Sequence, residues 1–306
     1  MDTKTKLQIA EKATVTVKFL DGFRPKSILT KSQIEQSVCF ARIAEAAYPL
    51  VNTDKTITDP VDRLKAIVGE APIKGYFSDS GAAGYVIRMP DMTIVVFRGT
   101  ELDLTNLGKI DLRDAKTDLD FKPVRFGVGF AHGGGFKSAM SLSALIDDVS
   151  DEPLPIHIVG HSLGSILAYI SAVMIPTNTR SHVSGVWAYC PPKTYDDIMT
   201  QKYNEVLGNV TLSFVNEIDF VPRFSVPNMK PKLHVPGTVV FLPSGSNIPV
   251  SFTLFQRILS AYRGYRLHGL SFKGTTKRLA QCHSIGEVAS RLGKMICIGV
   301  LPSISP

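Results

Sequence analysis

A short glycine-bounded turn between two apolar segments constrains this chain more than any other feature of its sequence. PIHIV at 155–159 has the length and composition of a buried strand, and SILAYISAVMI at 165–175 has the pattern of a helix ending before Pro176. GHSLG at 160–164 lies between them. So sharp a turn strains the residue at its apex, Ser162, and the flanking glycines leave room for it. The sequence therefore predicts a serine hydroxyl held above a sheet, at a helix N-terminus. The alternative is an ordinary N-cap serine.

Further strands and helices alternate along the chain. Strands are predicted at 84–89, 92–97, 155–159, 183–189, 210–215 and 238–242, and helices at 32–48, with Ser32 as N-cap, at 136–146 and at 165–175. This alternation favours the α/β class, with a mostly parallel central sheet flanked by helices. No repeat or long linker divides the chain, so we expect a single domain over 1–306, in which the role of residues 1–30 is open.

A serine hydroxyl becomes a good nucleophile only with a base beside it and a carboxylate that orients the base. After a turn of this kind the carboxylate precedes the histidine in the chain. Asp219 follows an apolar strand-like segment and precedes a Val-Pro that stops the strand, which favours it. Asp196 and Asp197 lie in a polar helical stretch, and Glu217 would point to the other side of the strand.

Three histidines follow Asp219. His234 is too close to the carboxylate strand to return from another loop, so His268 and His283 remain as candidates for the base. His268 lies in a basic segment, whereas His283 comes just before a final predicted helix. The second position suits a base on the loop after the last strand, although spacing alone leaves both open.

Four motifs together resemble a known family. TIVVFRGT at 93–100, AHGGGFKSAM at 131–140, GHSLG at 160–164 and NEIDFVPRF at 216–224 occur in the order found in class 3 lipases of the fungal type. Those proteins are α/β hydrolases with a Ser-Asp-His triad, and the resemblance covers about residues 35–295. The Cys-Pro-Pro after the strand at 183–189 is similar to the intracellular branch that includes the diacylglycerol lipases.

The resemblance implies a role for each matching residue. Ser162 matches the nucleophile, Asp219 the orienting acid and His283 the base. A leucine nine residues after the histidine, here Leu292, also matches the family and favours His283 over His268.

The same resemblance implies an oxyanion hole. Thr100 matches the residue whose backbone N–H joins that of Leu163 in binding the developing negative charge. His132 and the three glycines after it could instead form the oxyanion loop of a different esterase group. Only about 30 residues separate that motif from Ser162, so we expect its glycines to serve close packing beneath the nucleophile helix.

Two segments suggest contact with lipid. Residues 101–113 occupy the family's lid position and mix apolar with charged residues, although Ala115 stands where the family commonly has an aromatic residue. Residues 251–266 combine an apolar stripe with arginines, as in helices that lie on anionic bilayers. The alternative for residues 101–113 is a plain surface helix or loop, and that for residues 251–266 is a helix packed on the core with its arginines facing solvent.

The net charge of +7 has an uneven distribution. The last quarter, 230–306, carries 10 basic residues and one acid, Glu287. We expect a lipid ester substrate and transient contact with an anionic membrane, and no nucleic-acid partner because no binding motif is recognisable.

The four cysteines have no zinc-site spacing, so no metal or organic cofactor is expected. The N-terminus lacks a secretory pattern, which predicts a cytoplasmic protein. The activity expected is that of a serine ester hydrolase acting on glycerolipids. Phospholipase A1-type activity and a catalytically silent lipid-binding protein are the alternatives.

Overall fold

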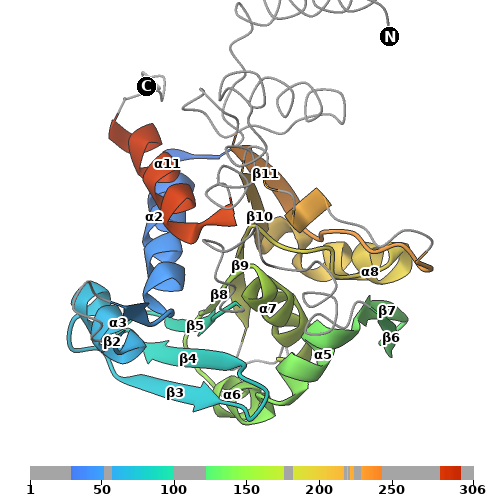
Figure 1. Ribbon diagram of the computed structural model, residues 1–306, viewed down its shortest axis with the longest axis horizontal. Coiled ribbons are helices and arrows are strands. Elements are labelled where there is room, and N and C mark those ends of the chain that lie inside the picture. Colours follow the sequence, from blue (N-terminus) through green and yellow to red (C-terminus); the bar gives the residue numbers. More distant parts are fainter. Residues whose placement is uncertain are drawn as a thin grey trace, which may run out of the picture.

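The computed structural model describes residues 29–51, 57–99, 122–175, 182–216, 219, 221–223, 229–242 and 283–297. A seven-stranded sheet forms its centre (Figure 1). In spatial order its strands are β11 (Thr238–Leu242), β10 (Thr211–Asn216), β9 (Val183–Tyr189), β8 (Ile156–His161), β5 (Thr93–Phe97), β4 (Ala83–Arg88) and β3 (Ile73–Phe77). The first five are parallel to one another, whereas β4 pairs antiparallel with both β5 and β3. The expected mostly parallel α/β sheet is confirmed.

Helices cover both faces of this sheet (Figure 1). One face carries α2 (Lys31–Ala46), α3 (Pro60–Val68) and α11 (Ile285–Cys297), and the other carries α5 (Gly133–Met140), α6 (Ser143–Val149), α7 (Leu163–Met174) and α8 (Asp197–Leu207). Two small antiparallel pairs lie outside the sheet, β1 (Leu50–Val51) with β2 (Ile57–Thr58) and β6 (Pro123–Phe126) with β7 (Gly129–His132). The result is a three-layer α/β/α arrangement.

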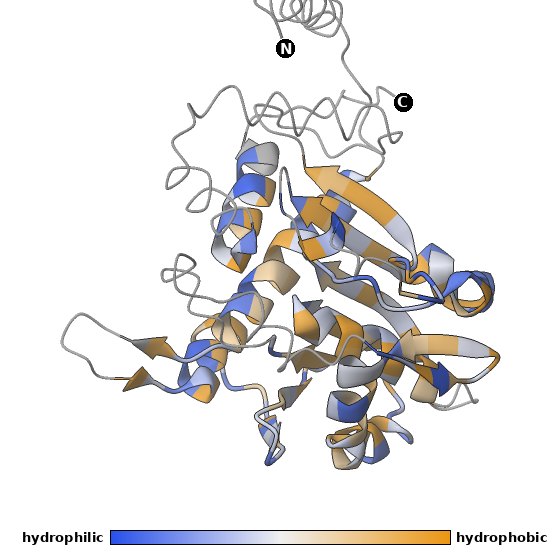
Figure 2. Cartoon of the chain, turned by 45° about the vertical axis from the view of Figure 1, so that its right-hand side comes forward, coloured by the Kyte–Doolittle hydropathy of each residue, from blue (hydrophilic) through white to orange (hydrophobic). Residues whose placement is uncertain are grey.

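The central strands are apolar because both of their faces are covered. In β5, Ile94 and Val96 pack toward α2, while Val95 and Phe97 pack toward α7, and all four are buried. Figure 2 shows the resulting apolar colouring of the sheet. The prediction of a strand covered on both faces is confirmed.

The N-cap of the first helix lies two residues earlier than expected. Thr30 rather than Ser32 is the N-cap of α2: its hydroxyl accepts a hydrogen bond from the Gln33 N–H, and the Gln33 side chain accepts one from the Thr30 N–H. This reciprocal pair is a capping box, a stronger start signal than a serine alone.

The prediction of a single helix at 136–146 is wrong. Two helices, α5 and α6, meet there at Ser141 and Leu142. Ser141 donates its hydroxyl to the Ser138 carbonyl, and the Leu142 side chain is buried between the two helices' core positions. Apolar periodicity continued across the break because both helices face the same core.

None of the helices in the described part of the chain combines the length and the hydropathy that crossing a bilayer requires.

Of the three glycines after His132, Gly135 packs closely against α7, as predicted. A Cβ on Gly135 in α5 would lie 2.2 Å from Cγ2 of Ile166 in α7, far inside van der Waals contact. Glycine therefore sets how closely α5 approaches the helix that carries Ser162 at its N-terminus.

A pair of glycine substitutions tests this packing. Gly135→Ala should destabilise the protein by about 1–3 kcal/mol, because α5 and α7 must move apart. Gly293→Ala, in α11 with no neighbouring atom near its new Cβ, should be neutral or stabilise by up to about 1 kcal/mol through helix propensity. Urea unfolding of both variants measures the difference. Equal stabilities would contradict the close approach.

Candidate active site

Ser162 lies at the apex of the turn between β8 and α7, with φ 55° and ψ −125°. A positive φ is strained for a serine, and such strain is common at functional sites. Its N–H donates to the Tyr189 carbonyl at 2.9 Å. The Ser165 hydroxyl donates to that same carbonyl at 3.1 Å and to the Gly160 carbonyl at 2.9 Å. These bonds tie the turn to β9.

The two glycines of the turn are required by contact. A Cβ on Gly160 would lie 2.2 Å from the Gly164 carbonyl oxygen, and one on Gly164 would lie 2.3 Å from the Phe97 carbonyl oxygen in β5. The start of α7 therefore packs directly on the ends of β8 and β5. This contact explains the glycine at each end of GHSLG.

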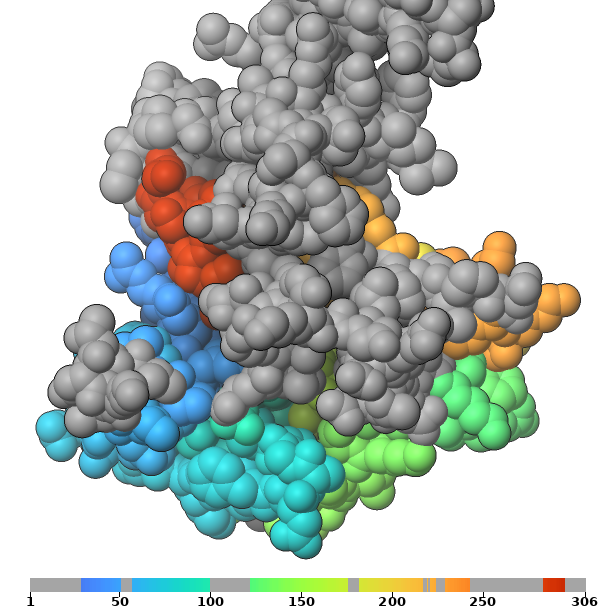
Figure 3. All heavy atoms as spheres, viewed as in Figure 1, coloured from blue at the N-terminus to red at the C-terminus, as the bar shows by residue number. Residues whose placement is uncertain are grey.

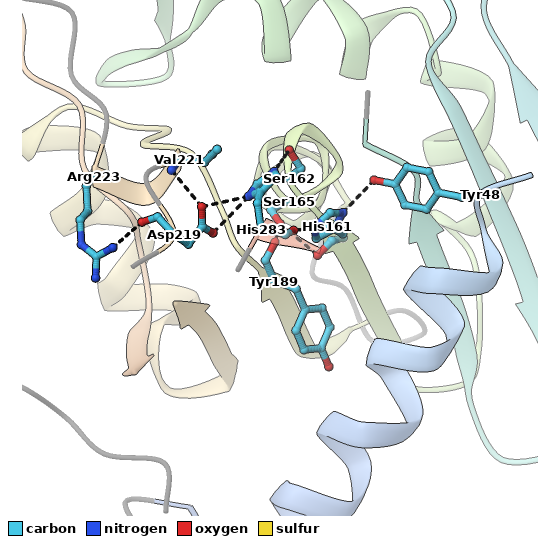
Figure 4. Close-up of polar contacts among 10 residues, drawn as sticks. Tyr48, His161, Ser162, Ser165, Tyr189, Asp219, Val221, Arg223 and His283 are labelled. Carbon is cyan, nitrogen blue, oxygen red and sulfur yellow. Dashed lines mark hydrogen bonds and ion pairs between the residues drawn. The ribbon is translucent and has the colours of Figure 1, made fainter. Parts of the chain in front are cut away.

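Ser162, His283 and Asp219 are joined by hydrogen bonds (Figure 4). Nε2 of His283 lies 2.8 Å from Oγ of Ser162, and Nδ1 lies 3.1 Å from both carboxylate oxygens of Asp219. The three residues expose 8%, 2% and 0% of their surface, so the line of contacts is almost fully desolvated.

The partners determine the proton positions. An ionised carboxylate only accepts hydrogen bonds, so Nδ1 of His283 carries the proton that faces Asp219. Nε2 then has a lone pair, and the Ser162 hydroxyl donates to it. In this arrangement Nε2 can take up the serine proton as the oxygen attacks an electrophile.

Backbone contacts hold the Asp219 carboxylate in place. Asp219 follows the end of β10, where its N–H donates to the Asn216 carbonyl at 2.8 Å. Its Oδ1 accepts the Val221 N–H at 3.0 Å, and the Arg223 guanidinium donates to its main-chain carbonyl. The side chain is thereby directed at His283 rather than at solvent.

The competing carboxylates are engaged elsewhere. Asp196 is the N-cap of α8 and accepts the N–H groups of Met199 and Phe130 at 3.0 and 3.1 Å. Asp197 is largely exposed and lies 2.8 Å from Nε2 of His234. Glu217 lies outside the described residues.

Among the other histidines, His132 is the N-cap of α5, and its Nδ1 accepts the Gly135 N–H at 3.2 Å. The alternative in which this motif forms an oxyanion loop is therefore not favoured. His268 lies outside the described residues, as do the segments 101–113 and 251–266.

Only part of the expected oxyanion hole falls within the described chain. Leu163 is the first residue of α7, where backbone N–H groups point out of the helix toward a negative charge. Thr100 lies outside the described residues. Gly99 immediately precedes it, and a Cβ on Gly99 would lie 3.1 Å from the Cβ of Ser162. The chain after β5 therefore passes directly beside the serine.

Sequence reasoning missed two residues, Tyr48 and His161. The His161 ring lies beside that of His283, with centroids 5.1 Å apart, and its Nε2 lies 2.7 Å from the main-chain carbonyl of His283. The Tyr48 hydroxyl lies 2.8 Å from Nδ1 of His161. A histidine in an otherwise apolar stretch was the available signal for His161. Tyr48 gave none.

Burial, and to a smaller extent the neighbouring His283 ring, lower the pKa of His161 to about 3. Burial removes the water that would stabilise a charged imidazole, so the neutral form is favoured. His161 is therefore uncharged at neutral pH.

One group of the described residues has side chains of the types that bind metals, at suitable spacing: His161, Cys190 and His283. All four ring nitrogens of the two histidines are within hydrogen-bond distance of other partners, namely Tyr48, a carbonyl, Ser162 and Asp219. A metal ion would have to displace these bonds, so the donor set does not favour one.

The sequence and the fold were compared with known proteins. Residues 94–229 match the family described as Lipase (class 3). A search of curated protein sequences gave no match.

Among solved structures, lipase II from Rhizopus niveus is 20% identical with a TM-score of 0.54, covering 72% of this chain and 84% of that one. The lipase from Rhizopus microsporus var. chinensis is 17% identical with a TM-score of 0.53, covering 71% and 76%. The triacylglyceride lipase of Rhizomucor miehei is 17% identical with a TM-score of 0.51, covering 70% and 82%. At these identities the likeness shows a shared fold.

The family match includes most of β5, the GHSLG turn and Asp219, and the shared fold covers 72% of the chain. Over residues 94–229 the chain is therefore similar to class 3 lipases, and the family match and the fold together support a serine ester hydrolase with an α/β-hydrolase fold.

Proposed function

We propose that this chain hydrolyses acyl esters of glycerolipids, with Ser162 as nucleophile, His283 as general base and Asp219 as the carboxylate that orients the base. The observation that carries the proposal is the continuous line of contacts from Oγ of Ser162 to Nε2 of His283, 2.8 Å, and from its Nδ1 to Asp219, 3.1 Å. Nucleophile, base and orienting group are within the reach that proton transfer needs.

The reaction follows from the proton positions. The Ser162 oxygen attacks the ester carbonyl carbon while its proton passes to Nε2 of His283, and Asp219 stabilises the imidazolium that forms. As the tetrahedral intermediate collapses, the ester C–O bond breaks and the leaving alcohol takes the proton from Nε2. A water molecule then attacks the acyl-enzyme, gives a proton to Nε2 and releases the fatty acid, and Ser162 regains its proton.

Negative charge develops on the carbonyl oxygen in both steps. We assign its stabilisation to the backbone N–H groups of Leu163 and Thr100. Support comes from the position of Leu163 at the N-terminus of α7 and from the contact of Gly99, the residue before Thr100, with Ser162. One such donor typically lowers the barrier by about 3 kcal/mol.

The finer identity that we propose is a diacylglycerol-lipase-like enzyme that acts in the cytoplasm at an anionic lipid surface. The Cys-Pro-Pro sequence after β9 and the excess of basic residues in 230–306 support it. Cys39 and Cys190 are both present as thiols, as is usual in a reducing compartment.

Replacement of the nucleophile tests the reaction. Ser162→Ala should lower kcat on carboxylic esters by at least about a thousandfold, because no other group can form the acyl-enzyme. A series of esters of increasing acyl length, with diacylglycerol, triacylglycerol and phospholipid as substrates, gives the rates and the preference. Ser171→Ala, a buried serine of the same helix, is the matched control and should keep wild-type activity. Equal turnover by wild type and Ser162→Ala would refute the enzyme proposal.

A second set of variants tests the base and the acid. His283→Ala should remove activity as completely as Ser162→Ala, and Asp219→Asn should lower kcat by about 10⁴-fold, because an amide that donates to Nδ1 favours the wrong tautomer of the imidazole. His268→Ala and Asp197→Asn should retain activity. Retained activity in His283→Ala together with loss in His268→Ala would assign the base to His268 instead.

Vesicle binding tests the lipid-surface proposal. The protein should sediment with vesicles containing phosphatidylserine more than with neutral phosphatidylcholine vesicles, and salt above about 0.5 M should weaken the difference by screening. The Ser162→Ala variant is suitable for this binding assay, since it cannot degrade the lipids of the vesicles. Equal, salt-insensitive binding to both vesicle types would contradict an electrostatic contact.

A further inference from the structure

His161, the residue before Ser162, has both ring nitrogens engaged inside the protein. Nε2 is 2.7 Å from the main-chain carbonyl oxygen of His283, and Nδ1 is 2.8 Å from the Tyr48 hydroxyl. The Tyr48 hydroxyl also accepts the Gly99 N–H at 2.9 Å. A line of hydrogen bonds therefore runs from the Gly99 N–H to the backbone of His283. Figure 4 shows Tyr48, His161 and His283 of this line.

Each proton in this line has one possible position. A carbonyl oxygen only accepts, so Nε2 of His161 carries a proton and donates it to His283. Nδ1 of the neutral ring is then an acceptor, and the Tyr48 O–H donates to it. The lone pairs left on the Tyr48 oxygen accept from Gly99. The bonds share one direction, from Gly99 through Tyr48 and His161 to His283.

The line requires a neutral His161. Protonation of Nδ1 would place two donors face to face at Tyr48. The titratable groups that face the ring are Tyr48 after α2, His283 before α11 and Cys190 after β9. No carboxylate of the described residues contacts it, and burial keeps its pKa near 3.

Both ends of the line belong to elements that the proposed reaction uses. Gly99 immediately precedes Thr100, the proposed oxyanion residue. The carbonyl that His161 binds belongs to His283 itself, so the bond restrains the main chain from which the imidazole extends. Peptide orientation and side-chain direction at one residue are coupled, and a shift at the carbonyl would move Nε2 relative to Ser162.

Helix packing brings Tyr48 and His283 to the same place. Tyr48 follows the C-terminus of α2, and His283 precedes the N-terminus of α11, and the two helices lie against each other (Figures 1 and 3). The Arg63 guanidinium donates to the carbonyls of Glu45 and Tyr48, which fixes the end of α2. A Cβ on Gly286 would lie 2.8 Å from the Glu45 carboxylate, so the helix ends approach closely.

We propose that Tyr48 and His161 are positioning residues that hold the imidazole of His283 and the backbone at Gly99 in register with Ser162. The proposal rests on the proposed function, because it assigns these residues to the efficiency of that reaction. Neither group touches the reacting atoms. Their effect should therefore appear in kcat, while the binding of the acyl chain is unchanged.

Three single substitutions, each made in the wild-type protein, test the proposal. Tyr48→Phe removes the hydroxyl and His161→Leu removes both bonds, and each should lower kcat about tenfold or more with KM within about twofold, the cost expected of a displaced catalytic group. His161→Gln can donate with its amide N–H and accept with its amide oxygen, so it should recover part of the loss seen in His161→Leu. Reaction of Ser162 with a fluorophosphonate should slow in parallel with kcat.

The matched control is Tyr203→Phe, which also loses a buried tyrosine hydrogen bond, to Thr211 at 2.9 Å, but lies in α8. It should keep wild-type kcat even where its stability falls. If Tyr48→Phe and His161→Leu behave like Tyr203→Phe, the positioning role is refuted. A rise in KM with unchanged kcat would also refute it.

An activity-independent measurement separates this inference from the proposed function. In ¹⁵N-histidine NMR of the whole protein, the signals absent from His161→Gln identify His161. They should show the neutral tautomer protonated at Nε2 and no titration down to about pH 4, in wild type and in Ser162→Ala. Titration near pH 6.5, or protonation at Nδ1, would overturn the inference even if the enzyme is active. With the tautomer as expected but no serine-dependent turnover, the proposed function fails, and the positioning role of Tyr48 and His161 in that reaction fails with it.

Discussion

Ser162 keeps a positive φ of 55° because three segments meet around it with no room for further atoms. A Cβ on Gly160 would clash with the Gly164 carbonyl, one on Gly164 would clash with the Phe97 carbonyl, and one on Gly99 would press against Ser162. The strained turn therefore also fixes the distance between β8, β5 and α7. An oxyanion donor after β5 and a donor at the start of α7 can converge on one oxygen only if this distance is set, and glycine at these three positions sets it.

The polar side chains of the site come from distant parts of the chain and are almost completely shielded from solvent. Asp219 is fully buried, and a buried carboxylate is tolerated only when its oxygens are hydrogen-bonded. Val221 and His283 supply these bonds. The low dielectric that makes an unpaired group costly also strengthens the bonds that are made. Loss of one partner should therefore affect the orientation of the others, which is why single substitutions here are compared with matched buried controls.

Local patterns predicted the sheet and the turn well. β8, β9, β11 and α7 fall within a residue or two of the expected bounds, because apolar runs bounded by glycine or proline carry the signal. Strand order and the antiparallel edge at β3 did not follow from the pattern, since strand pairing depends on contacts across the chain. The break between α5 and α6 was missed because both helices face the same core.

The residues of the site could be predicted from the sequence about as well as the fold. Ser162 followed from its turn and Asp219 from its place after a strand, and the structure brings both together with His283. The position of His283 before the final predicted helix favoured it over His268, and the resemblance to a family strengthened that preference. Tyr48 lies 113 residues from His161, and a bond over that separation leaves no trace in a local pattern.

The alternation of β8 explains why the residue before the serine faces α2 and α11. Val159 packs into the core on the α2 side, and His161, two residues later, points to the same face by the period of a strand. His161 therefore links the layer that contains α2 and α11 to the turn. A residue here must donate to a carbonyl and accept from a hydroxyl at once while it remains uncharged in a buried site. Neutral imidazole meets all three conditions, and lysine, arginine or an aliphatic side chain meets at most one or two.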